Sequence, residues 1–240
     1  YNTYQHVFNL TITSLNNSNA IRTGFIKFNH ILRQRFEDLI PEIKMINKDK
    51  YYIDPDISKA HTLPASFYRD PIVFEKIKSK IFLKSWQWVG DTEMVPEKNC
   101  VYPLIVLEDY LSEPVVITRT EDNKIHCLTN VCTHRGNIVV HEPAKQKKLV
   151  CMYHGRKFNM DGKYQFMPEF NEAKDFPGAC DNLHKFPITK WGKLIFIGLN
   201  PSFDFQNVID KMSERIGFMP IERFEFDKTL SKEYEIKAHW

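Results

Sequence analysis

Two short stretches of the chain each place one thiol close to one imidazole. Cys132 and His134 are separated by one residue, Cys151 and His154 by two, and sixteen residues lie between the pairs. Glycine follows each pair closely, and it lets a backbone turn tightly around a bound group because it has no Cβ. Two Cys and two His can hold a tetrahedral zinc ion, or a [2Fe–2S] cluster with Cys on one iron and His on the other.

The order of these residues bears on the choice of metal. Structural zinc sites usually pair like with like, with two Cys close in sequence and two His close in sequence. Here each stretch is mixed, which favours two loops that each give a Cys to one iron and a His to the other. We therefore predict a [2Fe–2S] cluster as cofactor, and a zinc-bound structural module remains the alternative.

These stretches are similar to the Rieske [2Fe–2S] signature. Residues 151–163, Cys-Met-Tyr-His-Gly-Arg-Lys-Phe-Asn-Met-Asp-Gly-Lys, resemble the second loop and hairpin of Rieske non-haem iron oxygenase α subunits. That family includes aromatic ring-hydroxylating dioxygenases and choline-type monooxygenases. The resemblance implies that Cys132 and Cys151 bind one iron and that His134 and His154 bind the other.

Three positions separate the chain from the Rieske proteins of respiratory complexes. Those proteins carry an extra Cys in each loop, joined as a disulfide, and Asn137 and Tyr153 stand at these places here. Arg156 replaces a hydroxyl residue that follows the second loop's His-Gly. Loss of a hydrogen-bond donor to the cluster lowers its potential, so we expect the low end of the Rieske range, about −150 mV.

The composition is that of an ordinary globular protein with one large or two small domains. Of the 240 residues, 42% are hydrophobic and 26% charged, and the net charge of +3 gives no argument for nucleic acid. We expect no membrane span, because no apolar run is long enough. Beyond the two predicted ligands, an odd set of three Cys remains: Cys100, Cys127 and Cys180. Such a remainder favours a reducing compartment, and we expect a cytoplasmic protein.

Residues 1–44 differ from the rest. No Asp or Glu precedes Glu37, and apolar residues recur at helical spacing from Ile21 to Leu39 among several basic ones. This composition resembles an organelle transit peptide. The simpler interpretation, which we favour, is an extension, disordered or non-native, that the folded domain does not need, with Met45 reading like a native start.

Residues 45–87 are predicted to be a lead-in arm and helix. Asp70 is a suitable N-cap and Pro71 a suitable first helical residue, and an apolar face continues to about residue 85. The run Phe67-Tyr68-Arg69-Asp70-Pro71 followed by an amphipathic helix and a Trp-rich strand resembles the lead-in of oxygenase α subunits.

Residues 88–200 read as the Rieske domain, a mainly β fold of short antiparallel strands. Strands are expected at 101–107, 115–120, 125–131, 183–188 and 194–199. A hairpin is expected around Asp161-Gly162, a dipeptide that suits a tight turn.

Residues 201–240 are expected to be the truncated start of an α+β catalytic domain. A helix is predicted over 205–216, ending at Gly217, and the alternation from Arg223 to Lys237 predicts one or two strands. The family activates oxygen at a mononuclear Fe(II) held by two His and one carboxylate, and we find no such motif here.

The resemblance therefore implies the α subunit of a Rieske oxygenase. It would accept electrons from a reductase or ferredoxin, with NAD(P)H as their source, and pass them to a mononuclear iron for O₂-dependent hydroxylation of an organic substrate. The full-length protein is expected to be a homo-oligomer, a trimer, with a choline-type substrate slightly favoured. The alternative is a stand-alone Rieske ferredoxin that carries electrons.

Overall fold

The structure is a computed structural model that describes residues 51–170 and 172–237. The predictions for residues 1–44, including the helical pattern from Ile21 and the start at Met45, lie outside the described residues. The chain divides into two units between Ile72 and Val73, and each is described by itself.

The described part of the first unit contains α4 (Ala65–Arg69) and the beginning of α5 (Pro71–Lys80). The backbone N–H of Ile72 donates to Asp70 Oδ1 at 3.0 Å, and the Tyr51 hydroxyl donates to Asp70 Oδ2 at 2.8 Å. The Asp-Pro start of the helix is thus confirmed. The helix is shorter than predicted, because after Lys80 the chain tightens into the 3-10 helix η2 (Phe82–Lys84).

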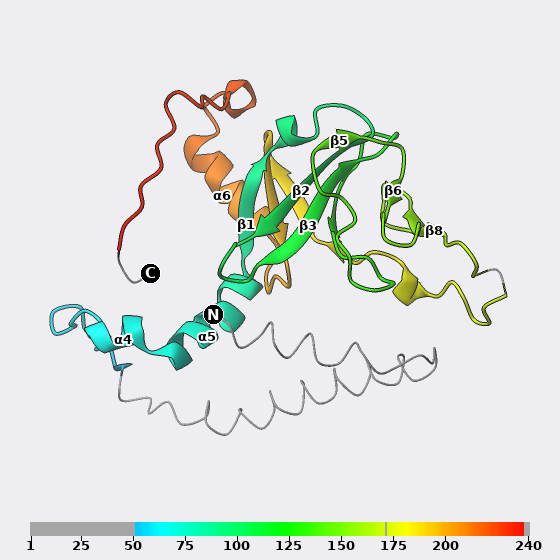
Figure 1. The fold of residues 1–240 in the computed structure, drawn as a ribbon. Coiled ribbons are helices and arrows are strands. Elements are labelled where there is room, and N and C mark those ends of the chain that lie inside the picture. The colour runs from blue at the N-terminus through cyan, green and yellow to red at the C-terminus, as the bar shows by residue number, and fades with distance from the viewer. Residues whose placement is uncertain (1–50, 171, 238–240) are drawn as a thin grey trace. The chain divides into compact units, whose positions relative to one another are not determined.

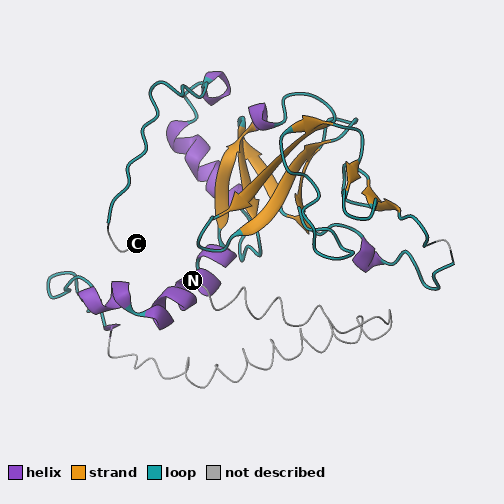
Figure 2. Ribbon diagram, viewed as in Figure 1, coloured by secondary structure: helices purple, strands orange, loops and turns teal. Residues whose placement is uncertain are grey.

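The second unit is built on three antiparallel sheets (Figures 1 and 2). A five-stranded sheet has the order β5-β2-β3-β4-β9, and two three-stranded sheets have the orders β1-β11-β10 and β6-β7-β8. Their bounds are β1 (Trp86–Asp91), β2 (Cys100–Val106), β3 (Glu113–Arg119), β4 (Ile125–Thr129), β5 (Ala144–Lys145), β6 (Leu149–Val150), β7 (Lys157–Phe158), β8 (Tyr164–Phe166), β9 (Lys185–Phe186), β10 (Ile188–Trp191) and β11 (Leu194–Gly198). The predicted class, mainly β and antiparallel, is confirmed.

Strand β3 is buried on both faces. Val115 and Ile117 pack in a core with Ile195 and Ile197 of the β1-β11-β10 sheet. Val116, which points to the opposite face, packs in a second core, whose other members are Val101, Leu128, Cys132, Val139, Val140, Leu149, Cys151, Phe158, Met160 and Leu183. Successive side chains of a strand point to opposite faces, so an uninterrupted apolar run is what a middle strand requires.

One of the strands predicted within residues 88–200 is divided in the structure. The run 183–188 is divided, because β9 pairs with β4 in one sheet while β10 pairs with β11 in another. The break falls at Pro187, which has no backbone N–H to give to a ladder. The hairpin at Asp161-Gly162 is confirmed: it joins β7 to β8, with Gly162 at φ +85°.

After the sheets, α6 (Gln206–Ile216) confirms the predicted helix, and Ile209 is its buried residue. The strands predicted over 223–237 are wrong. After the 3-10 helix η5 (Ile221–Arg223), residues 224–237 contain no strand, and Phe226, Leu230 and Tyr234 are more than three-quarters exposed. Alternation produces a strand only where a neighbouring edge supplies hydrogen bonds and one face is covered. No helix in the described part of the chain is long and apolar enough to cross a membrane.

Candidate metal centre

The four predicted ligands lie on two loops beside the β6-β7-β8 sheet (Figure 1). The first loop, residues 131–138, is closed by a bridge between Val131 and Ile138. The second loop, residues 151–156, connects β6 to β7. Because short strands hold both ends of the second loop and a bridge closes the first, each loop projects a Cys and a His from a fixed base.

The two loops share one backbone pattern. In the first, Cys132 N–H donates to Asn137 O at 2.8 Å and Gly136 N–H donates to Cys132 O at 3.0 Å. In the second, Cys151 N–H donates to the Arg156 carbonyl at 2.9 Å, and Gly155 N–H donates to Cys151 O at 3.0 Å. Asn137 and Arg156 therefore occupy the same position, five residues after the Cys of their loop.

Both loops need a glycine at their turn. Gly136 and Gly155 each have φ of +72°, in the left-handed region that favours glycine. A Cβ on Gly155 would also lie 3.3 Å from Cγ of Pro168, which is closer than ordinary packing. A side chain at either position would strain the loop that presents the Cys and His.

The four predicted ligands form two pairs in space, thiol with thiol and imidazole with imidazole. Cys132 and Cys151 are 3% and 2% exposed, and burial, together with the adjacent Cys151 thiol, raises the pKa of Cys132. The His134 and His154 rings are half-buried, with centroids 4.7 Å apart and planes at 78°. Within residues 51–170 and 172–237, no three His, Cys, Asp or Glu side chains gather around one point as a single bound ion would require.

The His134 side chain has an unpartnered atom. Its Nδ1 is buried and has no hydrogen-bond partner among the residues that the structure describes. A buried ring nitrogen without a partner costs free energy, and a bound metal ion is one way to satisfy it. Burial, followed by the neighbouring His154, lowers the pKa of His134 to about 4. The imidazole is therefore neutral near pH 7, which is the form that binds a metal. The donor set of two thiols, two imidazoles and this free nitrogen fits a [2Fe–2S] cluster with mixed ligands.

Arg156 is a buried charged side chain between the loops. It is 2% exposed, and its Nη1 donates to Thr133 Oγ1 at 2.8 Å and to Asp181 Oδ1 at 3.1 Å. Thr133 in turn donates to the backbone oxygen of Asp181 at 2.8 Å. Asp181 ends the 3-10 helix η4 (Ala179–Asp181), and its other carboxylate oxygen accepts from Gly178 N–H at 2.8 Å. Local sequence patterns do not predict this network, because Arg156 and Asp181 are 25 residues apart.

Asn137 reaches in the opposite direction, from the first loop to the second. Its Nδ2 donates to the Ile138 carbonyl at 2.8 Å and lies 3.8 Å from Cys151 Sγ, within range of a hydrogen bond to sulfur. From the sequence, Asn137 and Arg156 were interpreted only as replacements for a disulfide Cys and a hydroxyl donor. Each of the two residues follows the Cys of its own loop by five positions in the sequence. This shared spacing could have indicated that they have matching roles.

The rim of the second loop is exposed and apolar. Met152 and Tyr153 are 78% and 58% exposed, although they stand next to the buried Cys151. The Tyr153 ring lies with its centroid 3.8 Å from that of His154, and Phe170 lies with its centroid 5.9 Å from that of His134. Aromatic rings therefore flank both imidazoles.

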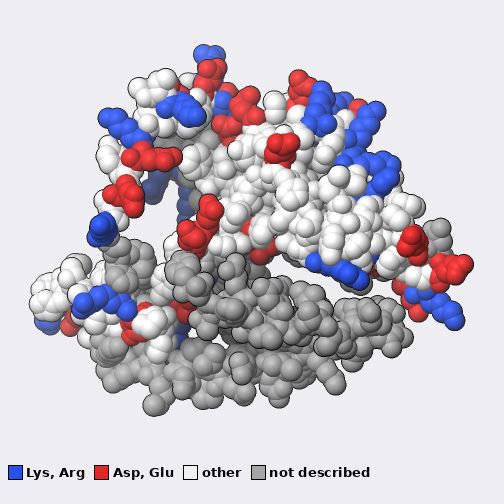
Figure 3. Space-filling model, in the orientation of Figure 1, with Lys and Arg blue, Asp and Glu red and all other residues white. Residues whose placement is uncertain are grey.

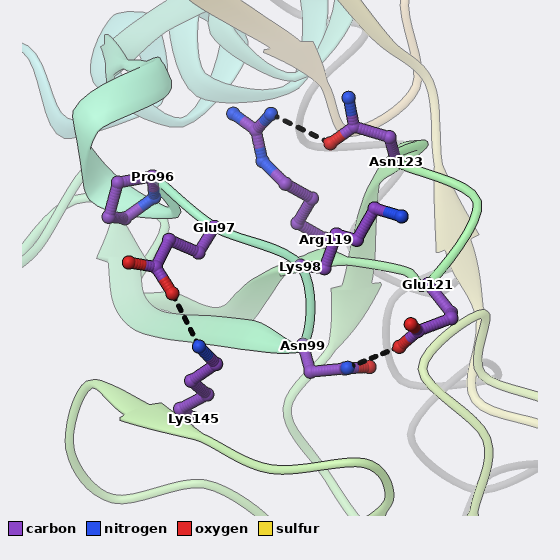
Figure 4. Close-up of a pocket in the computed structure, with 8 residues that line it drawn as sticks. All are labelled: Pro96, Glu97, Lys98, Asn99, Arg119, Glu121, Asn123 and Lys145. Atoms are coloured by element: carbon purple, nitrogen blue, oxygen red, sulfur yellow. Dashed lines mark hydrogen bonds and ion pairs between the residues drawn. The ribbon is translucent and has the colours of Figure 1, made fainter.

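A polar hollow lies beside the five-stranded sheet, and none of its lining residues belongs to these loops. Figure 4 shows three contacts within it: Glu97 pairs with Lys145, Asn99 donates to Glu121, and Arg119 donates to Asn123 at 3.1 Å. It holds no Cys or His. The face of the molecule in Figure 3 carries basic and acidic side chains intermixed, in line with the small net charge.

The stretch that contains both loops matches the model of a known protein family. Residues 85–177 match the Rieske [2Fe–2S] domain family. The chain is 29% identical over 196 residues to a choline monooxygenase of Beta vulgaris, covering 78% of this chain and 42% of that protein. It is 33% identical over 140 residues to a glycine betaine monooxygenase oxygenase subunit of Chromohalobacter salexigens, covering 58% of this chain and 30% of that protein. The chain thus spans less than half the length of these relatives.

Solved structures show the same fold. A quaternary ammonium Rieske monooxygenase superposes with a TM-score of 0.58 at 24% identity, covering 66% of this chain and 47% of that one. A naphthalene 1,2-dioxygenase from Rhodococcus sp. superposes with a TM-score of 0.53 at 24% identity, covering 69% of this chain and 35% of that one.

Proposed function

We propose that the chain is the electron-accepting part of a Rieske oxygenase, because residues 85–177 match the Rieske [2Fe–2S] domain family and the chain is similar to a choline monooxygenase. We propose that Cys132 and Cys151 bind one iron and that His134 and His154 bind the other. The observation that carries this assignment is the separate pairing of the two thiols and the two imidazoles, with a buried His134 Nδ1 that no atom of the described residues satisfies.

The cluster, when bound, would accept and release one electron at a time. The protein's own residues determine its surroundings. The two Cys side chains are almost fully buried, which keeps water from the sulfurs, while the two His rings remain half-buried. The low pKa of His134, caused mainly by burial, keeps that ring unprotonated and available for iron. The Asn137 amide would donate to the Cys151 sulfur.

For the whole protein we propose O₂-dependent hydroxylation of an organic substrate at a mononuclear iron. Electrons would come from a reductase or ferredoxin, and the assembly would be a homo-oligomer. A quaternary ammonium substrate is the class we favour, because several related proteins are named as choline, glycine betaine or carnitine monooxygenases. These relatives are oxygenase components, which favours this function over a stand-alone ferredoxin. A cytoplasmic location stays a prediction.

Iron and acid-labile sulfide analysis after anaerobic purification tests the cofactor. We expect about two irons and two sulfides per chain, and an EPR signal of the reduced protein with the low average g value of His ligation. Stoichiometric zinc without sulfide would contradict the proposal.

A His154→Ala variant tests the ligand assignment. We expect it to lose the visible spectrum of a His-ligated cluster. A variant that retained the wild-type spectrum and EPR signal would exclude His154 as a ligand.

A further inference from the structure

The matching positions of Asn137 and Arg156 have a consequence for how the two loops are held. Each side chain leaves its own loop and reaches the other one. Arg156 of the second loop donates to Thr133 of the first, at 2.8 Å. Asn137 of the first loop lies 3.8 Å from the sulfur of Cys151 in the second. The two loops therefore contact each other through reciprocal side chains, which is independent of any metal.

The Arg156 contact is the stronger of the two because it is buried and charged. A buried guanidinium is costly unless its donors are satisfied. Here Nη1 is shared between Thr133 and Asp181, and Nε lies 3.4 Å from the Met167 sulfur. The rings of Tyr164 and Phe176 lie 5.5 and 5.4 Å from the guanidinium carbon, within cation–π range.

The position of Thr133 makes this contact relevant to the predicted ligands. Thr133 lies between Cys132 and His134, so a fixed Thr133 limits the movement of both. Arg156 is the second residue after His154 and accepts, through its carbonyl, the N–H of Cys151. Arg156 thus links the two ligand-bearing loops to each other and to η4.

We propose that Arg156 is a positioning residue: its buried guanidinium, held by Asp181 and Thr133, fixes the two ligand-bearing loops relative to each other, and Asn137 braces them in return. An ionic and hydrogen-bonded brace thus joins the two loops. This inference rests on the proposed function only in that the two loops are taken to carry the cluster ligands.

The free cysteines of the chain make the test possible. Cys132 and Cys151 report opening of the loops, Cys127 is buried in β4 and reports global unfolding, and exposed Cys180 is an internal standard. Each is labelled with a maleimide on the full chain as purified, with its metal, and the rates are read by peptide mass spectrometry. Arg156→Met, Arg156→Lys and Asn137→Ala are compared with wild type, and Lys145→Met, which breaks an exposed ion pair, is the matched control.

We expect Arg156→Met to label Cys132 and Cys151 at least about tenfold faster relative to Cys180, the equivalent of about 1.4 kcal/mol. A much smaller rise is expected at Cys127. Asn137→Ala should raise the loop rates by roughly threefold, since it removes one weak hydrogen bond. The labelling rates of the loop cysteines in Arg156→Lys should lie between those of wild type and Arg156→Met, because an ammonium group cannot form the paired hydrogen bonds of a guanidinium. Lys145→Met should match wild type.

Loop rates in Arg156→Met within about twofold of wild type, well below the tenfold expectation, would overturn the proposal. So would an equal rise at Cys127 in both Arg156 variants, which would show a general loss of stability. Metal and sulfide content, measured on the same samples, judges the proposed function separately, because the labelling comparison holds for iron or zinc.

Discussion

Two ion pairs of this molecule have nearly the same chemistry and very different surroundings. Arg156 and Asp181, beside the predicted metal ligands, have side chains 3% and 16% exposed. Lys145 of β5 and Glu97 of the loop before β2 have side chains 62% and 66% exposed (Figure 4). The first pair joins two loops to η4 through further hydrogen bonds, whereas the second joins two exposed side chains that water can solvate equally well. A contact fixes structure when its partners have no alternative in solvent.

The largest effect should come from leaving the buried guanidinium without its carboxylate. In Asp181→Ala, Arg156 keeps its charge and loses its ionic partner, and removing one member of a buried pair costs about 3–5 kcal/mol. We expect the predicted cluster to be released to a chelator more than about tenfold faster than in wild type. The decay of visible absorbance in excess chelator measures this rate. A decay equal to that of the wild type would remove the contrast between the two pairs.

A smaller effect is expected from the neutral member of the buried network. Thr133→Val keeps the shape of the side chain but loses the acceptor for Arg156 and the donor to the Asp181 carbonyl. Such hydrogen bonds contribute about 1 kcal/mol each, so release to the chelator should accelerate by about fivefold. Thr189→Val, which changes a Thr of β10 in another sheet, is a suitable control. If both variants lost metal equally fast, the network would have no special role.

Asn137→Ala should change a redox property more than stability. A hydrogen bond to a ligand sulfur stabilises the reduced cluster, so its removal lowers the midpoint potential. We expect a decrease smaller than about 59 mV, the equivalent of a tenfold change for a one-electron couple. A spectroelectrochemical titration at fixed pH measures it. An unchanged or higher potential would show that the 3.8 Å contact to Cys151 carries no hydrogen bond.

The smallest effect should come from the exposed pair. Lys145 lowers the pKa of Glu97, so any stabilisation is present above the ordinary pKa of Glu and is lost as the pH falls through the lowered value. Since both side chains are solvated, we expect Lys145→Met to leave the urea midpoint at pH 7 unchanged and to alter only slightly its decline in acid. The urea midpoint of Asp181→Ala is measured alongside. If Lys145→Met lowered the midpoint as far as Asp181→Ala does, solvent exposure would not explain how much each ion pair contributes to stability.

Local sequence patterns predicted the features that neighbouring residues determine. Asp70-Pro71 predicted a helix start and Asp161-Gly162 predicted a hairpin, and in each case the deciding hydrogen bonds or backbone angles lie within a few residues. The uninterrupted apolar run of β3 likewise predicted a strand, although not that it closes two cores.

Features that depend on distant partners were not predicted. The alternation after Arg223 has the period of a strand, but no strand forms within residues 224–237. The Arg156 network depends on Asp181, which reaches the loops only after the β8 hairpin and η4 have folded back. The choice of Cys132, His134, Cys151 and His154 as ligands rested on spacing and resemblance, and it remains a prediction for the metal analysis to test.

The double burial of β3 sets the smallest piece of this protein that could be transplanted or studied alone. Around the second loop and the hairpin, Leu149, Phe158 and Met160 pack in one core with Val116 and Leu128 of the five-stranded sheet. Strand β3 cannot be cut away from the far sheet either, since its other side chains fill the space under Ile195 and Ile197. An excised peptide with the four ligands would therefore lack the packing that holds the loops in place. A graft that keeps the loops folded must include β3 and the residues of both cores that pack against it.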